Sequence, residues 1–367
     1  MSDADRDAGR DADRHAWALP GAEDLGGGVH RIPLPLPMAG LKAVNVYALV
    51  DPTGIDLIDS GMGLVHARTE LESALASLGF ELGDVSNFFI THAHRDHYTL
   101  AVELRRTLGS GRIALGAGEQ ANLVAARALG HGDGGGFLAD LQRMGALALA
   151  ERLGASSGSP GERPGAEEWE DPDSWIADGT ELEVRGRELR AINTPGHTRG
   201  HLVFHDAAAG VLFAGDHVLP HITPTIGFEP ARNRMALRDY LSSLRLILEL
   251  PDARLLPAHG PVQESAHKRV DELLAHHETR LEEILDAMTT GRSTAYEVAR
   301  SIRWTRRQQR YDDLELVSQL LAAGETAAHL EVLVLRGHLT RTTDPDGTDH
   351  YSLAGSLAGE ATREAPE

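Results

Sequence analysis

The stretch Thr91-His92-Ala93-His94-Arg95-Asp96-His97 directly follows an apolar run at residues 87–90, which is typical of a buried strand. It places three imidazoles and one carboxylate within six residues, at the end of that strand. Neutral imidazole and carboxylate are ligands for cations such as zinc, iron or manganese. Four donors so close together suit two adjacent ions better than one. The stretch therefore predicts a metal site.

Three further apolar runs end in the same way, because each delivers a histidine or an aspartate onto a turn that contains glycine. They lead into Pro195-Gly196-His197, Gly215-Asp216-His217 and Pro257-Ala258-His259-Gly260. Glycine lets the backbone turn sharply and approach a ligand closely. Functional side chains at the ends of several strands are how a scaffold gathers one site from distant parts of a sequence. We therefore expect these donors to join the first cluster.

Composition narrows the chemistry of the site. The chain has 367 residues, 19 histidines and no cysteine, so disulfides, thiolate metal ligands and cysteine nucleophiles are excluded. The net charge of −20 argues against a nucleic acid as the main partner. No run approaches the roughly 20 apolar residues that span a bilayer, and the N-terminus lacks the apolar core of a secretion signal. We expect a cytoplasmic protein with a small-molecule substrate and no membrane partner; its oligomeric state is left open.

The apolar pattern predicts two halves, residues 29–115 and 180–262, that each mix strands with flanking helices. In the first half, apolar runs flank the turn Asp51-Pro52-Thr53-Gly54, which predicts a hairpin. Leucines at helical spacing then precede Gly109, which is placed to end a helix. In the second half we predict strands at residues 182–184, 189–192, 202–204, 211–214 and 254–256, and a helix at residues 235–250.

Between the halves, residues 118–173 are predicted to form a helical insertion that acts as a lid beside the metals. Its helical pattern is broken by glycines at residues 130–136, and residues 154–173 are predicted to be a mobile loop. The acidic side chains of that loop are expected to repel a phosphate backbone: they are Glu162, Glu167, Glu168, Glu170, Asp171 and Asp173. The apolar side chains of the insertion either face a hydrophobic acyl chain or form the core of the lid: they are Leu123, Val124, Leu129, Phe137, Leu138, Leu141, Met144 and Leu147.

The C-terminal part is predicted to be a separate domain at residues 264–355. It begins with a strongly amphipathic helix at residues 266–288, whose apolar face includes His277. Shorter helices at residues 294–302 and 326–339 precede two strand-like pieces around the turn Asp344-Pro345-Asp346-Gly347. Helices followed by a hairpin predict a winged-helix-like arrangement. The remaining ranges are the predicted metal-binding domain at residues 17–263 and two disordered tails at residues 1–16 and 356–367.

The run from His92 to His97 matches the signature H-x-H-x-D-H and resembles the metallo-β-lactamase superfamily over about residues 29–262. The resemblance implies an α+β fold, an αββα sandwich with two divalent ions at the edge of its stacked sheets. The ions implied are Zn²⁺, with iron or manganese as alternatives. By the same resemblance, one ion is bound by His92, His94 and His197, the other by Asp96, His97 and His259, with Asp216 bridging them and Asp59 orienting a ligand through a hydrogen bond.

One departure from the family concerns the residues after the signature. Many relatives have two glycines there, whereas this chain has Tyr98 and Thr99, whose side chains are expected to narrow the pocket. Tyr98 is therefore predicted to face the substrate, together with His217 and His221, which follow the expected bridging aspartate. His201 and His277 are predicted to be structural residues.

The resemblance implies a hydrolase that uses a metal-bridging hydroxide, with Asp96 holding the orientation of that nucleophile. A ligand set without cysteine resembles the glyoxalase II and nuclease side of the family, and the net charge of −20 favours a small substrate, so the predicted substrate is a small thioester or ester. The alternative is a metal-dependent endoribonuclease, because the C-terminal segment resembles the β-lactamase-like protein 2 type. A lactonase or a non-enzymatic winged-helix nucleic-acid binder rank lower. The feature that favours nucleic acid is a basic run: Arg300, Arg303, Arg306, Arg307 and Arg310.

Overall fold

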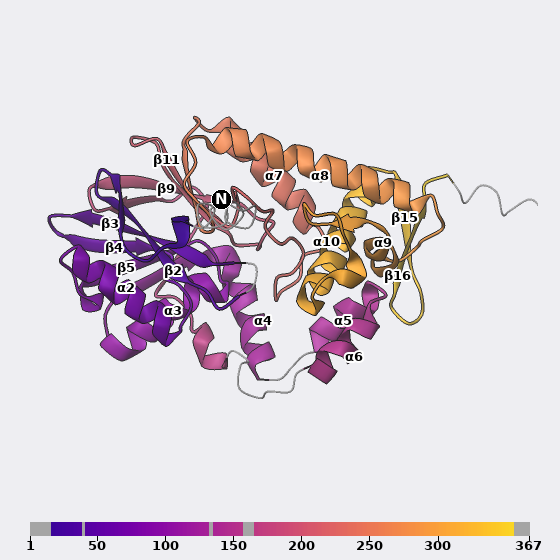
Figure 1. Ribbon diagram of the computed structural model, residues 1–367, viewed down its shortest axis with the longest axis horizontal. Coiled ribbons are helices and arrows are strands. Elements are labelled where there is room, and N and C mark those ends of the chain that lie inside the picture. Colours follow the sequence, from indigo (N-terminus) through magenta and orange to yellow (C-terminus); the bar gives the residue numbers. More distant parts are fainter. Residues whose placement is uncertain (1–15, 39–40, 132–134, 157–164, 356–367) are drawn as a thin grey trace, which may run out of the picture.

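A computed structural model describes residues 16–38, 41–131, 135–156 and 165–355 of the chain (Figure 1). Both predicted tails lie outside the described residues, apart from Ala16. Two β-sheets pack face to face, and helices cover the outer face of each. No helix in the described ranges has the length and apolar character needed to cross a lipid bilayer.

The first sheet has seven strands in sequence order. Neighbouring strands are antiparallel from β1 to β4 and parallel from β4 to β7. Asp51 pairs with Gly54, which confirms the predicted hairpin between β3 and β4. The strands are β1 (Glu23–Gly26), β2 (Val29–Pro35), β3 (Ala43–Asp51), β4 (Gly54–Ile58), β5 (Val85–Ile90), β6 (Arg112–Gly116) and β7 (Ser174–Ile176).

The second sheet has the order β12-β11-β10-β9-β8, and only its β11 and β12 are parallel. All five of its strands were predicted from the apolar pattern and are confirmed. They are β8 (Glu181–Val184), β9 (Arg187–Asn193), β10 (Leu202–Asp206), β11 (Val211–Gly215) and β12 (Arg254–Pro257).

Alternation along the strands builds the layers, because successive side chains of a strand point to opposite faces. In β3, Tyr47 and Leu49 point between the sheets, where Tyr47 meets Phe213 of β11 edge-on at 5.4 Å. Val46 and Ala48 point outward, against α2 (Val65–Ser77) and α3 (Arg95–Leu108). The outer face of the second sheet packs against α7 (Ala236–Glu249) and α8 (Ala266–Met288). The predicted αββα sandwich is confirmed.

The insertion is helical as predicted, but its helices are divided between two cores. Leu123 of α4 (Gln120–Gly130) packs with the first sheet and its helices. Leu141 of α5 (Gly135–Arg143) and Leu149 of α6 (Leu147–Ser156) instead pack with the C-terminal helices. Figure 1 shows this division, with α5 and α6 lying beneath α10.

The predicted mobile loop is partly wrong. Residues 157–164, which include Glu162, lie outside the described residues, but Ala166–Trp169 form a 3₁₀ helix whose Trp169 is buried in the first core. Four of the acidic residues predicted in this loop are paired with arginines of α3 and α4, whereas Glu167 is exposed and makes no ion pair with a described residue. The pairs are Arg95–Glu168, Arg105–Glu170, Arg106–Glu170, Arg127–Asp171 and Arg105–Asp173. These contacts remove most of the basis for a loop that repels phosphate.

The C-terminal part contains the predicted amphipathic helix, α8, and the predicted hairpin of β15 (Leu339–Thr343) and β16 (Asp349–Leu353). The last helix, α10 (Leu316–Leu335), is longer than the predicted 326–339. Gly324, which weakens the helical signal, lies inside it, where a Cβ would approach the Gly227 carbonyl at 3.6 Å. The predicted end was wrong because Leu339 pairs with Leu353 in the hairpin.

Two features of this part bear on the predicted winged helix. Between α9 (Ala295–Ser301) and α10 lies an unpredicted small hairpin of β13 (Arg303–Trp304) and β14 (Gln309–Arg310). Helix α10 has 12 of its 20 residues buried. A winged-helix protein reads DNA by placing an exposed helix in the major groove. The burial of α10 does not fit that use.

Candidate metal centre

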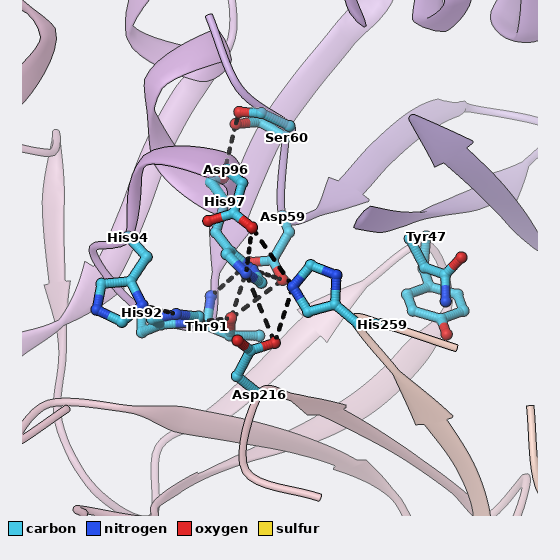
Figure 2. Close-up of polar contacts among 12 residues, drawn as sticks. Tyr47, Asp59, Ser60, Thr91, His92, His94, Asp96, His97, Asp216 and His259 are labelled. Atoms are coloured by element: carbon cyan, nitrogen blue, oxygen red, sulfur yellow. Dashed lines mark hydrogen bonds and ion pairs between the residues drawn. The ribbon is translucent and has the colours of Figure 1, made fainter. Parts of the chain in front are cut away.

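Seven donor side chains meet at one edge of the sandwich, where the strands of both sheets end (Figure 2). His92 and His94 follow β5, and Asp96 and His97 lie in the first turn of α3. The remaining three come from the second sheet: His197 follows β9, Asp216 follows β11 and His259 follows β12. They form one group of His92, His94, His197 and Asp216 and a second of Asp96, His97 and His259, each with its donor atoms within 4.8 Å of one another.

In the first group, imidazole nitrogens face one another at hydrogen-bond distance. His94 Nδ1 lies 3.0 Å from His92 Nε2 and 2.9 Å from His197 Nε2. The other ring nitrogen of His197 donates to the Thr225 carbonyl at 2.7 Å, so in the neutral ring Nε2 carries a lone pair. Convergent nitrogen lone pairs repel unless a cation lies among them. The geometry fits a bound metal ion.

In the second group and on the side of Asp216 that faces it, several buried atoms have no hydrogen-bond partner among the described residues. They include His97 Nε2, His259 Nε2 and the Oδ1 atom of Asp216. His259 Nε2 lies 3.4 Å from Asp96 Oδ2 and 3.3 Å from Asp216 Oδ1, while His97 Nε2 lies 3.7 and 3.6 Å from the same two oxygens. Buried polar atoms are normally paired, so such a cluster needs an explanation. A cation among these four atoms supplies one.

Asp216 faces both groups. Its Oδ2 lies 3.5 Å from His197 Nε2, and its Oδ1 is the oxygen that lies beside His97 and His259. One carboxylate therefore presents one oxygen to each group.

Asp59 orients one histidine of each group (Figure 2). Its Oδ2 accepts from His97 Nδ1 at 2.9 Å, which leaves Nε2 of that ring free. Its carboxylate also accepts from the Thr91 hydroxyl at 3.0 Å, so the Thr91 oxygen accepts from His92 Nδ1 at 3.0 Å. Asp59 adopts the left-handed φ of 60°, which is rare for a residue with a side chain. Such strain persists where the surroundings fix it, and here the Phe89 carbonyl accepts from the Asp59 amide at 3.0 Å.

His201, expected to be structural, also contacts the site. Its Nε2 accepts from the Asp216 backbone N–H at 3.1 Å, so the ring is neutral and its proton is on Nδ1, which donates to the Thr194 hydroxyl at 3.0 Å. Burial, with neighbouring imidazoles, lowers the pKa of His201 well below its usual value. The position four residues after His197 was the available sequence signal, but it does not show which atom the ring contacts.

The two groups differ in charge when no metal is considered. Burial lowers the pKa of His94 to about 3 and that of His197 to about 4, and it lowers the pKa of His92 well below its usual value. Burial also acts to lower the pKa of His97, but the carboxylates of Asp96, Asp59 and Asp216 outweigh it and raise that pKa to about 10. The pKa of His259 is raised against burial by Asp216 and Asp96. The three histidines of the first group are thus neutral, whereas His97 in the second holds a proton that a cation must displace.

The structure separates the three residues expected to face a substrate. The prediction that Tyr98 faces a substrate is wrong. Its ring is fully buried in the core between the first sheet and its covering helices, and its hydroxyl donates to the Glu170 carbonyl at 2.6 Å. His217 is also fully buried, with its ring 5.2 Å from that of Tyr240. His221 is exposed, and its Cδ2 atom lies near Gly260, the residue after His259. Of the three, only His221 is open to solvent.

Two protein-family models match this chain, one over the donor residues and one over the C-terminal part. A family model described as "Metallo-beta-lactamase superfamily" matches residues 39–259. A second, described as "Metallo-beta-lactamase-like, C-terminal domain", matches residues 281–354. The first range contains all seven donors.

Three relatives illustrate the similarity. A metallo-beta-lactamase family protein from Thermus thermophilus, known from a crystal structure, has 31% sequence identity to this chain and a TM-score of 0.67. The match covers 90% of this chain and 100% of the Thermus chain. The beta-lactamase-like protein 2 homolog of Caenorhabditis elegans is 36% identical over 31% of this chain and 36% of its own. The atrochrysone carboxyl ACP thioesterase of Aspergillus fumigatus is 26% identical over 69% of this chain and 47% of its own. The chain thus spans about a third to a half of these two curated relatives.

Proposed function

The chain belongs to the metallo-β-lactamase superfamily, and from that premise we propose that it is a metal-dependent hydrolase of a small thioester or ester. The observation that carries the proposal is the pair of donor groups on either side of Asp216, with orphaned acceptor atoms aimed between them. That arrangement matches what two adjacent cations require from a protein. The activity, the number of ions and their identity are parts of the proposal.

The donors divide as follows in the proposed site. His92, His94 and His197 hold one ion, Asp96, His97 and His259 hold the other, and Asp216 contacts both. The set consists of imidazoles and carboxylates, which suits Zn²⁺, with iron or manganese as alternatives. When bound, two such cations supply hydroxide near neutral pH and polarise the oxygen of the bond to be cleaved.

The chain's own residues position what reacts. His92, His97, His197 and His259 are buried, whereas His94 is only partly buried and the Asp96 side chain is 13% exposed, so His94 and Asp96 are the donors nearest solvent. One oxygen of Asp96 faces His97 and His259, and the other points away from them in Figure 2. We assign Asp96 the role of accepting a hydrogen bond from the attacking water. Asp59 fixes the ring orientation of His97 directly and that of His92 through the Thr91 hydroxyl.

An acyl substrate is favoured by the insertion. Leu123, Leu141 and Met144 are buried in the two cores, so these three side chains do not face a substrate. Val124, Leu129, Leu138 and Leu147 are exposed and thus available to a hydrophobic acyl group, whereas Phe137 packs partly against the core shared with the C-terminal helices. The Aspergillus relative is named as a thioesterase, which supports the same class of substrate.

Endoribonuclease activity is the second candidate, and one observation favours it. Arg303, Arg306, Arg307 and Arg310 on the β13–β14 hairpin are exposed and make no ion pair with any described residue. Exposed guanidinium groups of this kind bind phosphate. The buried α10 and the net charge of −20 weigh against it.

The test loads purified protein with zinc and presents acyl thioesters, esters, lactones and single-stranded RNA side by side. We expect metal-dependent thioester or ester turnover, with nearly all of it lost in Asp216→Ala, which also controls for contaminating hydrolases. Elemental analysis of the same sample should give about two ions per chain. Metal-dependent RNA cleavage without acyl hydrolysis would make the nuclease the better assignment.

A further inference from the structure

Two buried carboxylates, Glu119 and Glu229, lie beside the metal-ligand loops without belonging to either donor group. Glu119 ends the 3₁₀ helix η3 (Ala117–Glu119), where the insertion leaves the first sheet, and it is fully buried. Glu229 lies in the segment between β11 and α7 and is 3% exposed. A buried carboxylate is costly unless it is hydrogen-bonded, so the partners of these two indicate what they do.

The hydrogen-bond partners of Glu119 are donors, and they include groups from two metal-ligand loops. Its Oε1 accepts from the Thr198 hydroxyl and from the Gly200 N–H at 3.2 Å, both just after His197. Burial raises the pKa of Glu119 to about 7, and the Ala93 N–H, between His92 and His94, is among the donors that act to lower it. Glu119 therefore faces both the His92–His94 loop and the segment that follows His197.

The packing around Glu119 leaves no room for movement. A Cβ on Gly200 would overlap the Glu119 nitrogen, and a Cβ on Gly118 would lie 2.7 Å from the Gly200 Cα. Only glycine permits so close an approach of two backbones. The start of the insertion is thus in direct backbone contact with the loop that carries His197.

The Asn122 side chain hydrogen-bonds both carboxylates, and its orientation makes it the donor to each. Its Oδ1 accepts from the Ala231 N–H at 3.0 Å, so its Nδ2 is the donor, to Glu119 Oε2 at 2.8 Å and to Glu229 Oε2 at 2.9 Å. The same Glu229 oxygen accepts from the Arg199 N–H at 2.9 Å, whereas Glu229 Oε1 has no partner among the described residues. Glu119 therefore uses both oxygens, and Glu229 uses one.

We propose that Glu119 is a positioning residue that sets the geometry of the first donor group, so that the root of the insertion governs how tightly its metal ion binds. The inference rests on the metal site of the proposed function. Glu119 holds the loops of His92–His94 and His197 at a fixed separation, and the convergence of their nitrogens depends on that separation.

The asymmetry between the two carboxylates supplies a matched pair of variants. In Glu119→Gln the amide must turn its NH₂ toward a donor, either Asn122 Nδ2 or the donors from the ligand loops, and an unpaired buried donor follows. In Glu229→Gln the NH₂ can take the place of Oε1, which accepts from no donor among the described residues, while Oε2 keeps its hydrogen bonds and only the charge opposite Arg199 Nε, at 3.5 Å, is lost. The same chemical change should therefore disturb the metal group at position 119 and not at position 229.

The experiment titrates the metal-free full-length protein with Co²⁺ and follows its visible absorption, which reports coordination geometry independently of turnover. For Glu119→Gln we expect the Co²⁺ ion in the first donor group to bind about 10–100-fold more weakly, as is typical when a group that orients metal ligands is lost. We also expect its absorption spectrum to change. For Glu229→Gln we expect wild-type affinity and spectrum. Thr198→Val, which removes one donor to Glu119 while keeping the side-chain shape, should shift the spectrum in the same direction as Glu119→Gln.

Circular dichroism of each variant separates misfolding from a local effect. If Glu119→Gln does not fold, Thr198→Val carries the test, and wild-type binding and spectrum in that variant would overturn the inference. Equal losses in Glu119→Gln and Glu229→Gln would overturn it too, because the effect would not be specific to the ligand loops. If the wild-type protein itself binds no Co²⁺, the proposed metal site fails instead, so the two failures are distinguishable.

Discussion

For four of the five donor histidines, a hydrogen bond on the outer nitrogen decides which nitrogen faces the centre. For His197 and His259 the acceptors are the carbonyls of Thr225 and Ala43, at 2.7 and 2.8 Å. For His97 the acceptor is the Asp59 carboxylate. A neutral ring that donates from one nitrogen keeps a lone pair on the other. These contacts, far apart in the sequence, prepare the nitrogens that a metal ion needs.

The unequal charges of the two groups predict unequal proton release on metal loading. At pH 7 the histidines of the first group are already neutral, because the pKa values of His94 and His197 are lowered to about 3 and 4. His97, whose pKa is raised to about 10, is protonated and must lose its proton to bind a cation. Since protons compete with metal, affinity of the second group should fall as the pH falls, by about tenfold per unit for one proton, while that of the first changes little across the neutral range.

Calorimetric titrations with Zn²⁺ in two buffers of different ionisation enthalpy measure this release. We expect little release with the ion that fills the first group and about one proton or more with the other. Asp59→Asn is the control, because loss of that charge lowers the pKa of His97 and should reduce the second release. Equal release for both ions would contradict the charge assignment.

At the scale of elements, the insertion is held in place at two points rather than one. Helix α4 packs on the first sheet, while α5 and α6 pack on the C-terminal helices. Helices that are packed into two existing cores do not fit the predicted lid that closes as one body.

Two leucines of α5 test this division. Leu141 is fully buried in the core shared with the C-terminal helices, whereas Leu138 is 49% exposed. Leu141→Ala should lower the free energy of unfolding by about 2–5 kcal/mol, through lost burial and a cavity. Leu138→Ala should change it by less than about 0.5 kcal/mol. Urea unfolding of both variants measures the difference, and equal small effects would show that α5 is not anchored in the core.

At the scale of the whole molecule, one hydrophobic core crosses the predicted boundary at residue 263. It includes Leu212 of the second sheet, Tyr240 of α7, Leu273 of α8 and Leu330 of α10. Figure 1 shows α8 running from the second sheet toward the C-terminal helices. Ion pairs of Arg234 with side chains beyond α8 cross the same boundary.

A chain truncated after Gln263 is therefore expected not to fold stably. It would lose the helices that bury one side of α7, where Tyr240 and Leu244 are fully buried in the intact chain. The measurement is circular dichroism with thermal melting of the truncated protein, beside the full-length chain. A cooperative melt together with zinc binding by the fragment would show that residues 17–263 are an independent domain after all.

The sequence by itself determined the five strands of the second sheet, strands β3 to β5 of the first, the hairpin at Asp51–Gly54 and the candidate donors, but not β1, β6, β7 or the β13–β14 hairpin. The predicted features follow from local patterns: the period of two in a strand, turn residues between apolar runs, and histidines and aspartates placed just after strand ends. The cluster from His92 to His97 is short enough that its meaning depends little on the rest of the chain. For that reason the sandwich and both donor groups could be expected from the sequence and its resemblance to a family.

Only the tertiary structure decided how each side chain is used. Tyr98 and His221 both follow donor motifs, yet one is fully buried and the other exposed, because α3 turns Tyr98 into the first core. The contact of Glu119 with Thr198 joins residues 79 positions apart, and that of Asp59 with His97 joins residues 38 apart. Hydrogen bonds of this kind depend on where two distant segments meet, and no periodicity within either segment records that meeting.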